Sequence, residues 1–229
     1  MVSATELVRA AAAAGLRVLA VTDHDNFGAI PEAREAGLQF GVEVVAGEEV
    51  TTDKPARVHV VGLFLDGPVR MGMPVVDTVR AIHDQGGLAI IAHPFMPTYF
   101  ASITPPGLRR LISRQRVDGI ELRHTAVTTA SRIRELDAFY ELHQDRLGAA
   151  IGSSDSHFGA HDLARTVTLF PGSTAADLRR AIEARQTIPL EKYRQPAGPA
   201  LTTRLRQQAR SMGWLAWQRW RGKIGREGA

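Results

Sequence analysis

Along residues 3–190, short apolar runs alternate with segments whose apolar side chains recur with the period of an α-helix. Short apolar runs bounded by turn residues are typical of strands, and several here lack any polar alternation, as strands buried on both faces do. The expected strands are Val18–Val21, Val42–Thr51, Arg57–Leu65, Leu88–Ala92, Gly119–Leu122, Ala149–Gly152 and Thr166–Phe170. Asp53-Lys54-Pro55 is typical of a turn, so the second and third strands are expected to form a hairpin.

The segments between the strands have the pattern of amphipathic helices. The first is expected to begin after Ser3, which can cap it together with Glu6 three residues later. Gly37 is expected just past the end of the second helix, and Ser173 or Thr174 is expected to cap the last. The expected helices are Thr5–Ala14, Ala29–Ala36, Pro74–Gln85, Pro106–Gln115, Ser131–Asp145 and Thr174–Ala184. Helices and strands that alternate at this spacing indicate an α/β fold whose parallel sheet is wound as a barrel.

The pattern changes at about residue 190. A linker rich in Pro, Ala and Gly is followed by a basic amphipathic helix and then by Trp214, Trp217 and Trp220. We therefore expect a barrel domain over residues 1–190 and a helical tail over 191–229. The tail carries nine Lys/Arg and two Asp/Glu, a net charge of +7, whereas the rest of the chain has a net charge of −3. The basic pI therefore reflects the tail, which either packs its Trp face onto the barrel or binds an acidic surface.

Composition narrows the chemistry. The chain has no cysteine, so disulfides and thiolate metal sites are excluded, and any metal must be held by imidazole and carboxylate groups. Such ligands favour Mn, Fe or Zn. No apolar run reaches the ~18 residues of a membrane span. The first residues lack the order of a signal peptide, so a cytoplasmic location is expected.

Histidines and carboxylates recur where the apolar runs end. His24, His93 and His157 each follow such a run, and Asp155 lies two residues before His157. The carboxyl ends of strands in an α/β barrel meet at one rim, so these side chains can share one metal cluster. Glu49 lies inside an apolar strand, where an ionised carboxylate is costly unless it is paired or bound to a cation. One such histidine alone is more often a packed polar residue than a ligand, and the prediction depends on the repetition.

Two further histidines have weaker positions. His59 lies in the apolar run Val58–Leu63, and His124 follows a strand from which its side chain could point toward the others. Either could instead pack in the core or contact a metal-binding residue without binding the metal itself. The candidate metal-binding residues are therefore His24, Glu49, His59, His93, His124, Asp155 and His157, of which His24, Glu49, His93, Asp155 and His157 are also the candidate catalytic residues.

Taken in order, these segments resemble the motifs of the PHP family, named for polymerase and histidinol phosphatase. The motifs are Thr22-Asp23-His24-Asp25, Gly47-Glu48-Glu49-Val50-Thr51, His59 before Val60-Val61-Gly62-Leu63, Ala92-His93-Pro94, Gly119-Ile120-Glu121 and Ser154-Asp155-Ser156-His157. The resemblance covers residues 3–186 and is specific as an ordered set. It implies a distorted (β/α)7 barrel, a centre of two or three divalent metal ions (Mn, Zn or Fe) and hydrolysis of phosphoesters.

The resemblance also implies roles for individual residues. His24 and His157 would help to hold one metal, Glu49 would bridge two metals with His93 on one of them, and Asp155 would hold the metal that also takes the family's first motif. His59 would lie in or beside the cluster, and family members vary at the position of His124. Asp23 and Asp25 are expected to fix loops, and Glu48 is expected to face outward by strand alternation.

The chain departs from the family at its start. Family members begin with a strand that ends in His-x-His, and this sequence has no histidine before His24. Either the sequence is a shortened form of a longer protein, which the intact later motifs favour, or it is a degenerate member. In both cases we expect a barrel without its first strand and one metal position short of ligands. Whether the chain as it stands is active therefore depends on how much that metal position contributes.

The leading function is metal-dependent hydrolysis of phosphoesters, with a phosphorylated small molecule such as a nucleotide, or a short nucleic acid, as substrate. Arg123 and Arg165 are candidates to hold the substrate phosphate, because a guanidinium group matches phosphate geometry, although both could equally form surface ion pairs. The alternative is a non-catalytic PHP module that serves as a scaffold or binding domain.

Overall fold

The computed structural model describes residues 2–96, 101–125, 129–157 and 161–192, all within one compact unit, Met1–Tyr193. The linker and Trp-bearing helix expected in the tail lie outside the described residues. The division into two domains and the packing of the tail therefore stay predictions. In the described ranges no helix is long and apolar enough to cross a membrane, and the cytoplasmic location stays a prediction.

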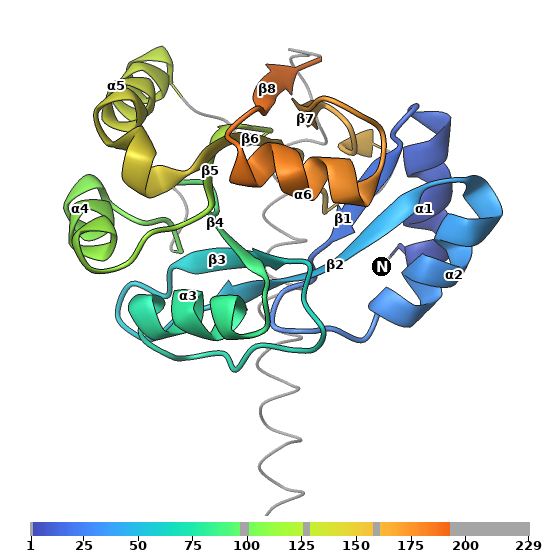
Figure 1. Ribbon diagram of the computed structural model, residues 1–229, viewed down its shortest axis with the longest axis horizontal. Coiled ribbons are helices and arrows are strands. Elements are labelled where there is room, and N and C mark those ends of the chain that lie inside the picture. Colours follow the sequence, from blue (N-terminus) through green and yellow to red (C-terminus); the bar gives the residue numbers. More distant parts are fainter. Residues whose placement is uncertain (1, 97–100, 126–128, 158–160, 193–229) are drawn as a thin grey trace, which may run out of the picture. The chain divides into compact units, whose positions relative to one another are not determined.

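The centre of this unit is a curled six-stranded sheet with the order β1-β2-β3-β4-β5-β6 (Figure 1). Its strands are β1 (Val18–Val21), β2 (Glu43–Thr51), β3 (His59–Leu63), β4 (Leu88–Ile91), β5 (Gly119–His124) and β6 (Ala149–Ser153). β3 runs antiparallel to both of its neighbours, and the other neighbouring strands are parallel. The expected hairpin of β2 and β3 is confirmed, with Thr51 opposite His59 beside the turn.

The sheet is a half-barrel whose two edge strands are β1 and β6. β7 (Thr166–Leu169) and β8 (Ile188–Glu191) form a separate antiparallel pair. β8 is not predicted from the sequence, because Ile188 and Leu190 are exposed and Pro189 between them is unusual inside a strand. The α/β class and the curled, largely parallel sheet are confirmed. The count of seven barrel strands and the lack of a first strand stay predictions.

Most of the helices pack on the outside of the curled sheet, and the last one packs across one end of its inside (Figure 1). They are α1 (Ala4–Ala13), α2 (Ile30–Phe40), α3 (Val75–Asp84), α4 (Pro105–Arg114), α5 (Ala130–Leu147) and α6 (Ala175–Glu183). α1 and α2 pack on β1 and β2 through a cluster that includes Val8, Val21 and Ala33. A larger cluster joins the sheet to α3, α4 and α5. The capping box of Ser3 and Glu6 is confirmed, and the cap of α6 is Thr174.

The second helix is longer than expected. It continues through Gly37 to Phe40, and Gly41 ends it in the left-handed region with a φ of 68°. A Cβ atom on Gly37 would lie 2.5 Å from the carbonyl oxygen of Val42. Gly37 therefore allows α2 to lie close to the residue that precedes β2, and the prediction that it marks the helix end is wrong.

The inside of the curl has two contrasting ends. At one end, which we call the apolar end, side chains from the starts of the parallel strands and from the end of β3 pack against Ile182 of α6. This cluster contains Val45, Leu63, Leu88, Ile90, Ala149, Ile151 and Ile182. Full burial of such a side chain stabilises the fold by about 1.5–3 kcal/mol. At the polar end, the parallel strands finish and β3 begins, and here the expected site residues lie.

Candidate metal centre

The topology of the sheet brings side chains from four segments to the polar end. His24 follows β1, Glu49 lies near the end of β2, and His93 follows β4. His59 is the first residue of β3, and because β3 runs the other way, its start reaches the same rim as the ends of its neighbours. A single backbone β-bridge between His24 and Glu49 continues the parallel pairing of β1 with β2 up to this rim.

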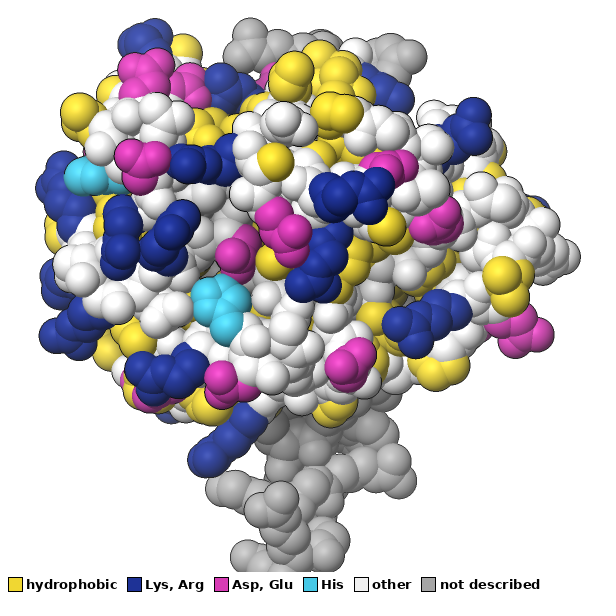
Figure 2. All heavy atoms as spheres, viewed as in Figure 1, with side chains coloured by type: hydrophobic (Ala, Val, Ile, Leu, Met, Phe, Trp, Pro, Cys, Tyr) yellow, Lys and Arg dark blue, Asp and Glu magenta, His cyan; other side chains and the backbone are white. Residues whose placement is uncertain are grey.

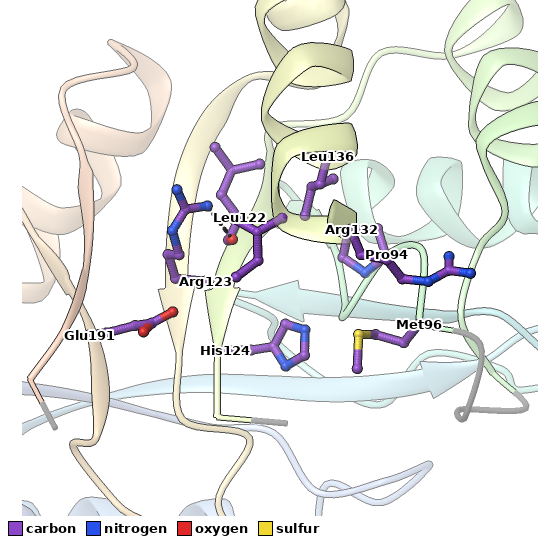
Figure 3. A pocket seen from close by; sticks show the side chains of 9 residues that line it. Pro94, Met96, Leu122, Arg123, His124, Arg132, Leu136 and Glu191 are labelled. Atoms are coloured by element: carbon purple, nitrogen blue, oxygen red, sulfur yellow. Dashed lines mark hydrogen bonds between the residues drawn. The ribbon is translucent and has the colours of Figure 1, made fainter. Parts of the chain in front are cut away.

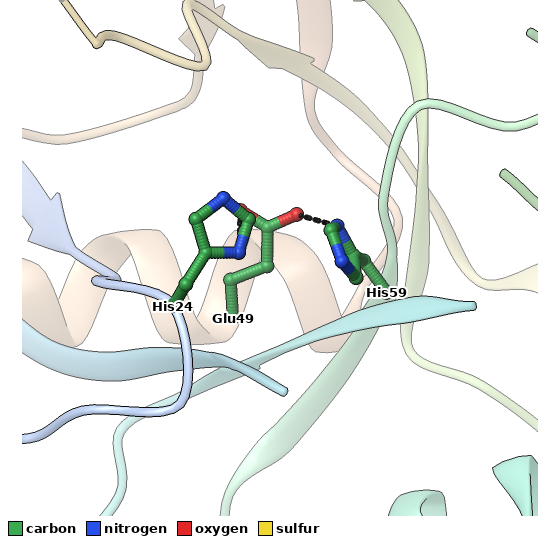
Figure 4. Close-up of side chains that lie close together, drawn as sticks. All are labelled: His24, Glu49 and His59. Carbon is green, nitrogen blue, oxygen red and sulfur yellow. Dashed lines mark ion pairs between the residues drawn. The ribbon is translucent and has the colours of Figure 1, made fainter. Parts of the chain in front are cut away.

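Glu49 is the centre of the group (Figure 4). Its Oε1 lies 2.7 Å from His59 Nδ1 and 3.2 Å from His93 Nε2, whereas its Oε2 lies 3.7 Å from His24 Nδ1. The carboxylate lies between the rings of His24 and His59. One oxygen thus faces one pair of imidazoles and the other oxygen faces a third, which is the arrangement required of a carboxylate that bridges two ions.

The spacing of the donor atoms fits a divalent metal. His24, Glu49 and His59 each offer one donor atom, and these atoms lie within 4.8 Å of one another. His59 Nδ1 and His93 Nε2 are 3.3 Å apart. Two nitrogens bound to one tetrahedral ion at about 2.0–2.1 Å are also separated by about 3.3 Å. The contact of 2.7 Å between Glu49 and His59 is a hydrogen bond, so these two groups would separate slightly around an ion.

The other candidates surround this group. The ring centroids of His24 and His157 are 5.6 Å apart, and His157 Nδ1 lies 3.5 Å from Asp155 Oδ1. Burial raises the pKa of Asp155, and the nearby charge of Glu49 raises it further. Burial and the positive charge of His93 lower the pKa of His124 to about 4. All seven predicted metal-binding residues therefore lie at the polar end, although their roles as ligands stay predictions.

Electrostatic interactions link Glu49 to the imidazoles. Burial raises the pKa of Glu49, but the charge of His24 and the hydrogen bonds with His59 and His93 outweigh burial and hold this pKa well below its usual value. Burial also lowers the pKa of His93, and its hydrogen bond to Glu49 reverses that effect and raises it to about 9. The ionised carboxylate thus requires adjacent positive charge, which protonated imidazoles or a bound cation can supply.

Glu121 is a residue of this site that the sequence analysis does not single out as a ligand or a catalytic group. It lies on β5, is buried, and its Oε2 accepts a hydrogen bond of 2.7 Å from the backbone N–H of His93. Burial raises the pKa of Glu121 to about 7. On the other side of the same loop, the Ser102 hydroxyl donates to the carbonyl oxygen of His93 and accepts from the N–H of Met96. These bonds fix the backbone that carries His93.

Three loops at the polar end contain a residue in an unusual backbone conformation. Asp25, His93 and Asp155 have φ values of 47°, 30° and 44°. Each follows a parallel strand, and none is a glycine. Such conformations cost of order 1–3 kcal/mol each and are retained where the surrounding contacts enforce them, often at functional sites. Their position supports a functional role for these three loops.

The residues next to the predicted ligands have structural contacts. The Oδ1 of Asp25 accepts a hydrogen bond of 2.7 Å from the N–H of Thr51, which joins the loop after β1 to β2 as expected. Asp23 bonds to the same strand through its backbone carbonyl, which accepts from the N–H of Glu49. Glu48 does point to the opposite face of β2 from Glu49, but it is only 1% exposed and accepts a hydrogen bond from Val69 N–H. The outward direction expected for Glu48 is therefore confirmed, and its side chain is buried there because the chain around Val69 covers that face.

The arginines differ in their availability for a phosphate. Arg123 makes two bonds to Asp137, of 2.7 Å and 3.0 Å, at one side of a small pocket that also contains His124 (Figure 3). Arg132 lines the same pocket, and its guanidinium donates a hydrogen bond of 2.9 Å to the carbonyl oxygen of Phe95 and forms no ion pair with any residue that the structure describes. Arg165 is half-buried and has no ion pair with any described residue. Arg132 and Arg165 are therefore freer than Arg123 to meet an anion.

Known proteins match parts of this chain. No protein-family model matches it. An uncharacterised protein of Methanocaldococcus jannaschii is 36% identical over 91 residues, which are 40% of this chain and 52% of that protein. A 5'-3' exoribonuclease of Haemophilus influenzae is 43% identical over 91 residues, 39% of this chain and 33% of the enzyme. The matched stretches thus span about half of the first relative and a third of the second.

Solved structures match most of this chain. A two-domain protein of Bacteroides vulgatus, which contains a predicted PHP-like metal-dependent phosphoesterase, matches with a TM-score of 0.62 and 20% identity over 81% of this chain and 59% of that one. A lesion-specific endonuclease of Pyrococcus furiosus matches with a TM-score of 0.58 and 16% identity over 80% of this chain and 51% of that one. At these identities the similarity establishes the fold. The PHP-like fold implied by the sequence motifs is therefore confirmed.

Proposed function

We propose that this chain, which has the fold of the PHP-like metal-dependent phosphoesterases, hydrolyses phosphoesters with the help of divalent metal ions held at its polar end. The observation that carries the proposal is the position of Glu49, whose two carboxylate oxygens face different imidazoles. A buried carboxylate surrounded by histidine nitrogens is a donor set for Mn, Zn or Fe. The number and identity of the ions are part of the proposal.

In this proposal His24, Glu49, His59 and His93 hold the ions, with His124, Asp155 and His157 completing the set. Divalent ions at such a site stabilise the negative charge of a phosphate and activate a water molecule for attack on phosphorus. Glu121 and Ser102 hold the loop of His93 in place. The guanidinium groups of Arg132 and Arg165 bind phosphate oxygens, because each can donate two parallel hydrogen bonds.

We propose a nucleotide or a short oligonucleotide as the substrate. Two of the similar proteins, the exoribonuclease and the lesion-specific endonuclease, are named for action on nucleic acids. The alternative of a non-catalytic scaffold gains no support from the described residues, since the donors at the polar end retain the spacing that a metal requires.

The decisive experiment is metal reconstitution of the full chain. The protein is stripped with a chelator, its metal content is measured after separate additions of Mn, Zn and Fe, and phosphate release is followed with mononucleotides, oligonucleotides and histidinol phosphate. We expect stoichiometric binding of at least one ion and metal-dependent turnover of one substrate class. If the metal-bound protein turns over none of these phosphoesters, the proposed activity is contradicted and the scaffold is favoured.

A further inference from the structure

A groove between α4 and α5 lies on the outside of the half-barrel. Its volume is about 470 Å³, and its lining residues are Arg109, Ile112, Ser113, His143 and Arg146. Two of these side chains are arginines, one is a histidine and none is acidic. The groove is therefore electropositive, although the net charge of residues 1–190 is negative.

Further positive charge surrounds the groove. Residues 105–117 contain Arg109, Arg110, Arg114 and Arg116 and no Asp or Glu. All four arginines are exposed, and none forms an ion pair with another described residue. Figure 2 shows Lys and Arg side chains gathered over α4, at the left of the view. This concentration of positive charge on α4 and just after it is a feature of the surface that the overall charge of the domain conceals.

Two of the arginines are held in place by their neighbours. The Arg109 guanidinium lies 5.4 Å from the centroid of the Phe139 ring, in a cation–π contact, and the His143 ring lies 4.6 Å from the same ring. The Nε of Arg146 donates a hydrogen bond of 2.8 Å to the carbonyl oxygen of Ile112. These contacts orient positive side chains from both helices toward one groove, so less conformational entropy is lost when an anion binds.

The acidic residues of α5 do not cancel this charge. Asp137 is bonded to Arg123, and Asp145 is bonded to Arg185 at 2.6 Å. Glu135 and Glu141 are exposed on the same helix and make no ion pair with the described arginines of α4. The carboxylates nearest to Arg146 in the sequence are therefore either engaged elsewhere or separate from the groove.

We propose that the α4–α5 groove binds the sugar-phosphate backbone of a single-stranded nucleic acid, and so acts as an accessory site for the substrate of the polar end. The inference rests on the proposed function for the identity of that substrate. α4 has ten residues and is about 15 Å long, so its arginines can contact successive phosphates of one strand. A single phosphate could contact only one or two of these arginines. A groove of about 470 Å³ can take in the backbone of one strand but not a duplex.

α5 connects the groove with the metal centre. Arg132 near its start bonds to the backbone of Phe95, two residues after His93, and Arg146 lies fourteen residues further along the helix. Fourteen residues of α-helix span about 21 Å. A substrate strand must therefore extend over at least about 21 Å to occupy the centre and the whole groove at once, and shorter substrates should gain nothing from the groove.

The test compares two double variants of the full chain with the same change in net charge. Arg109→Glu with Arg114→Glu alters the groove, and Arg34→Glu with Arg80→Glu alters exposed positions on α2 and α3. Fluorescence anisotropy in chelator measures binding of labelled single strands of about three and about twelve nucleotides, between about 50 and 200 mM salt. The basic tail is the same in both variants and so cancels in the comparison. Circular dichroism melting verifies that both are folded.

We expect the groove variant to bind the long strand at least about tenfold more weakly than the control, and to bind the short strand equally well. Replacing the same two arginines with Gln should reduce the slope of log affinity against log salt by about 0.7 for each lost phosphate contact. Equal losses in both double variants would overturn the proposal. So would a selective loss of binding to duplex, or to anionic lipid vesicles, with single-strand binding unchanged. Because binding is measured without metal, failure of the hydrolytic activity would leave this result intact.

Discussion

The two ends of the same curled sheet bury different kinds of side chain. At the apolar end, side chains such as Val45, Ile151 and Ile182 pack against one another, and burial alone stabilises them. At the polar end, Glu49, Glu121 and His93 are buried just as deeply, with exposed fractions of 6%, 5% and 2%. Groups of this kind destabilise a fold unless they are hydrogen-bonded or paired with opposite charge.

The comparison shows where this fold accepts an energetic cost. Backbone strain occurs at both ends, since Phe64, which packs against the apolar cluster, has a φ of 59°, whereas the buried carboxylates Glu49 and Glu121 lie at the polar end. A cluster of this composition is retained when it performs a task that an apolar core cannot, and binding of a divalent ion would also neutralise its carboxylates. The difference between the ends predicts that mutations at one end should change function and at the other end stability.

The largest effect is expected from Glu49→Gln. This substitution keeps the size of the side chain but removes the charge that faces three imidazoles, so metal affinity should fall by more than about 100-fold. Isothermal titration with Mn or Zn measures the loss. Glu141→Gln, at an exposed position of α5, is the matched control and should bind metal as the wild type does. Wild-type affinity in Glu49→Gln would show that the carboxylate is not a ligand.

Ile182→Ala should act at the apolar end alone. Ile182 is 2% exposed, and truncation of such a side chain destabilises a fold by about 2–5 kcal/mol. Chemical denaturation measures the change in unfolding free energy. The amount of metal bound by the remaining folded protein should not change. A lower metal stoichiometry at a temperature where the variant is fully folded would show that the two ends are coupled.

Glu121 offers a finer test of the polar end. Glu121→Met removes the acceptor for the His93 N–H at similar volume, whereas Glu121→Gln keeps an acceptor at that position. Loss of a group that orients a ligand typically weakens metal binding by about 10–100-fold. We expect that loss in the Met variant and affinity near the wild-type value in the Gln variant. If both variants bind equally weakly, the charge of Glu121 matters and not its hydrogen bond.

The smallest effect is expected from a histidine outside the cluster. The hydrogen bond of 2.7 Å to Asp118 raises the pKa of His83 above 6.5. Protonated His83 therefore stabilises the fold below pH 6.5, and this contribution is lost as the pH rises through the raised pKa. The pair is part-exposed, so the contribution should stay below about 1 kcal/mol. Unfolding free energies from pH 6 to 9 should fall more in the wild type and in His161→Gln than in His83→Gln; parallel curves would refute the linkage.

The sequence predicts much of the polar end because strand ends can be recognised. His24, His93 and His157 follow apolar runs, and parallel strands that end together place such residues at one rim. Glu121 is missed as a site residue even though its signal is the same as that of Glu49, a carboxylate inside an apolar strand. Arg132 is missed for another reason: it lies on a polar helix, and only the packing of α5 brings it to the carbonyl of Phe95.

The sequence also misleads where an average conceals a local feature. The net charge of residues 1–190 is slightly negative, which argues against anion binding by the domain as a whole. The arginines of α4 nevertheless form a basic surface, because the acidic residues that balance their charge in the total lie on other elements. Gly37 misleads for a similar reason. A glycine is needed there because the carbonyl oxygen of Val42, just before β2, lies close to the helix, and not because the helix ends.

By itself, the sequence determined the alternation of strands and helices, the hairpin and the positions of the histidines, because these follow from local periodicity and from chain order. The tertiary structure alone decided that β3 starts at the rim where its neighbours end, that the two oxygens of Glu49 face different imidazoles, and that Arg123 is engaged with Asp137. Such contacts join residues far apart in the chain. They depend on distances and directions in the folded sheet, which no local pattern of residues encodes.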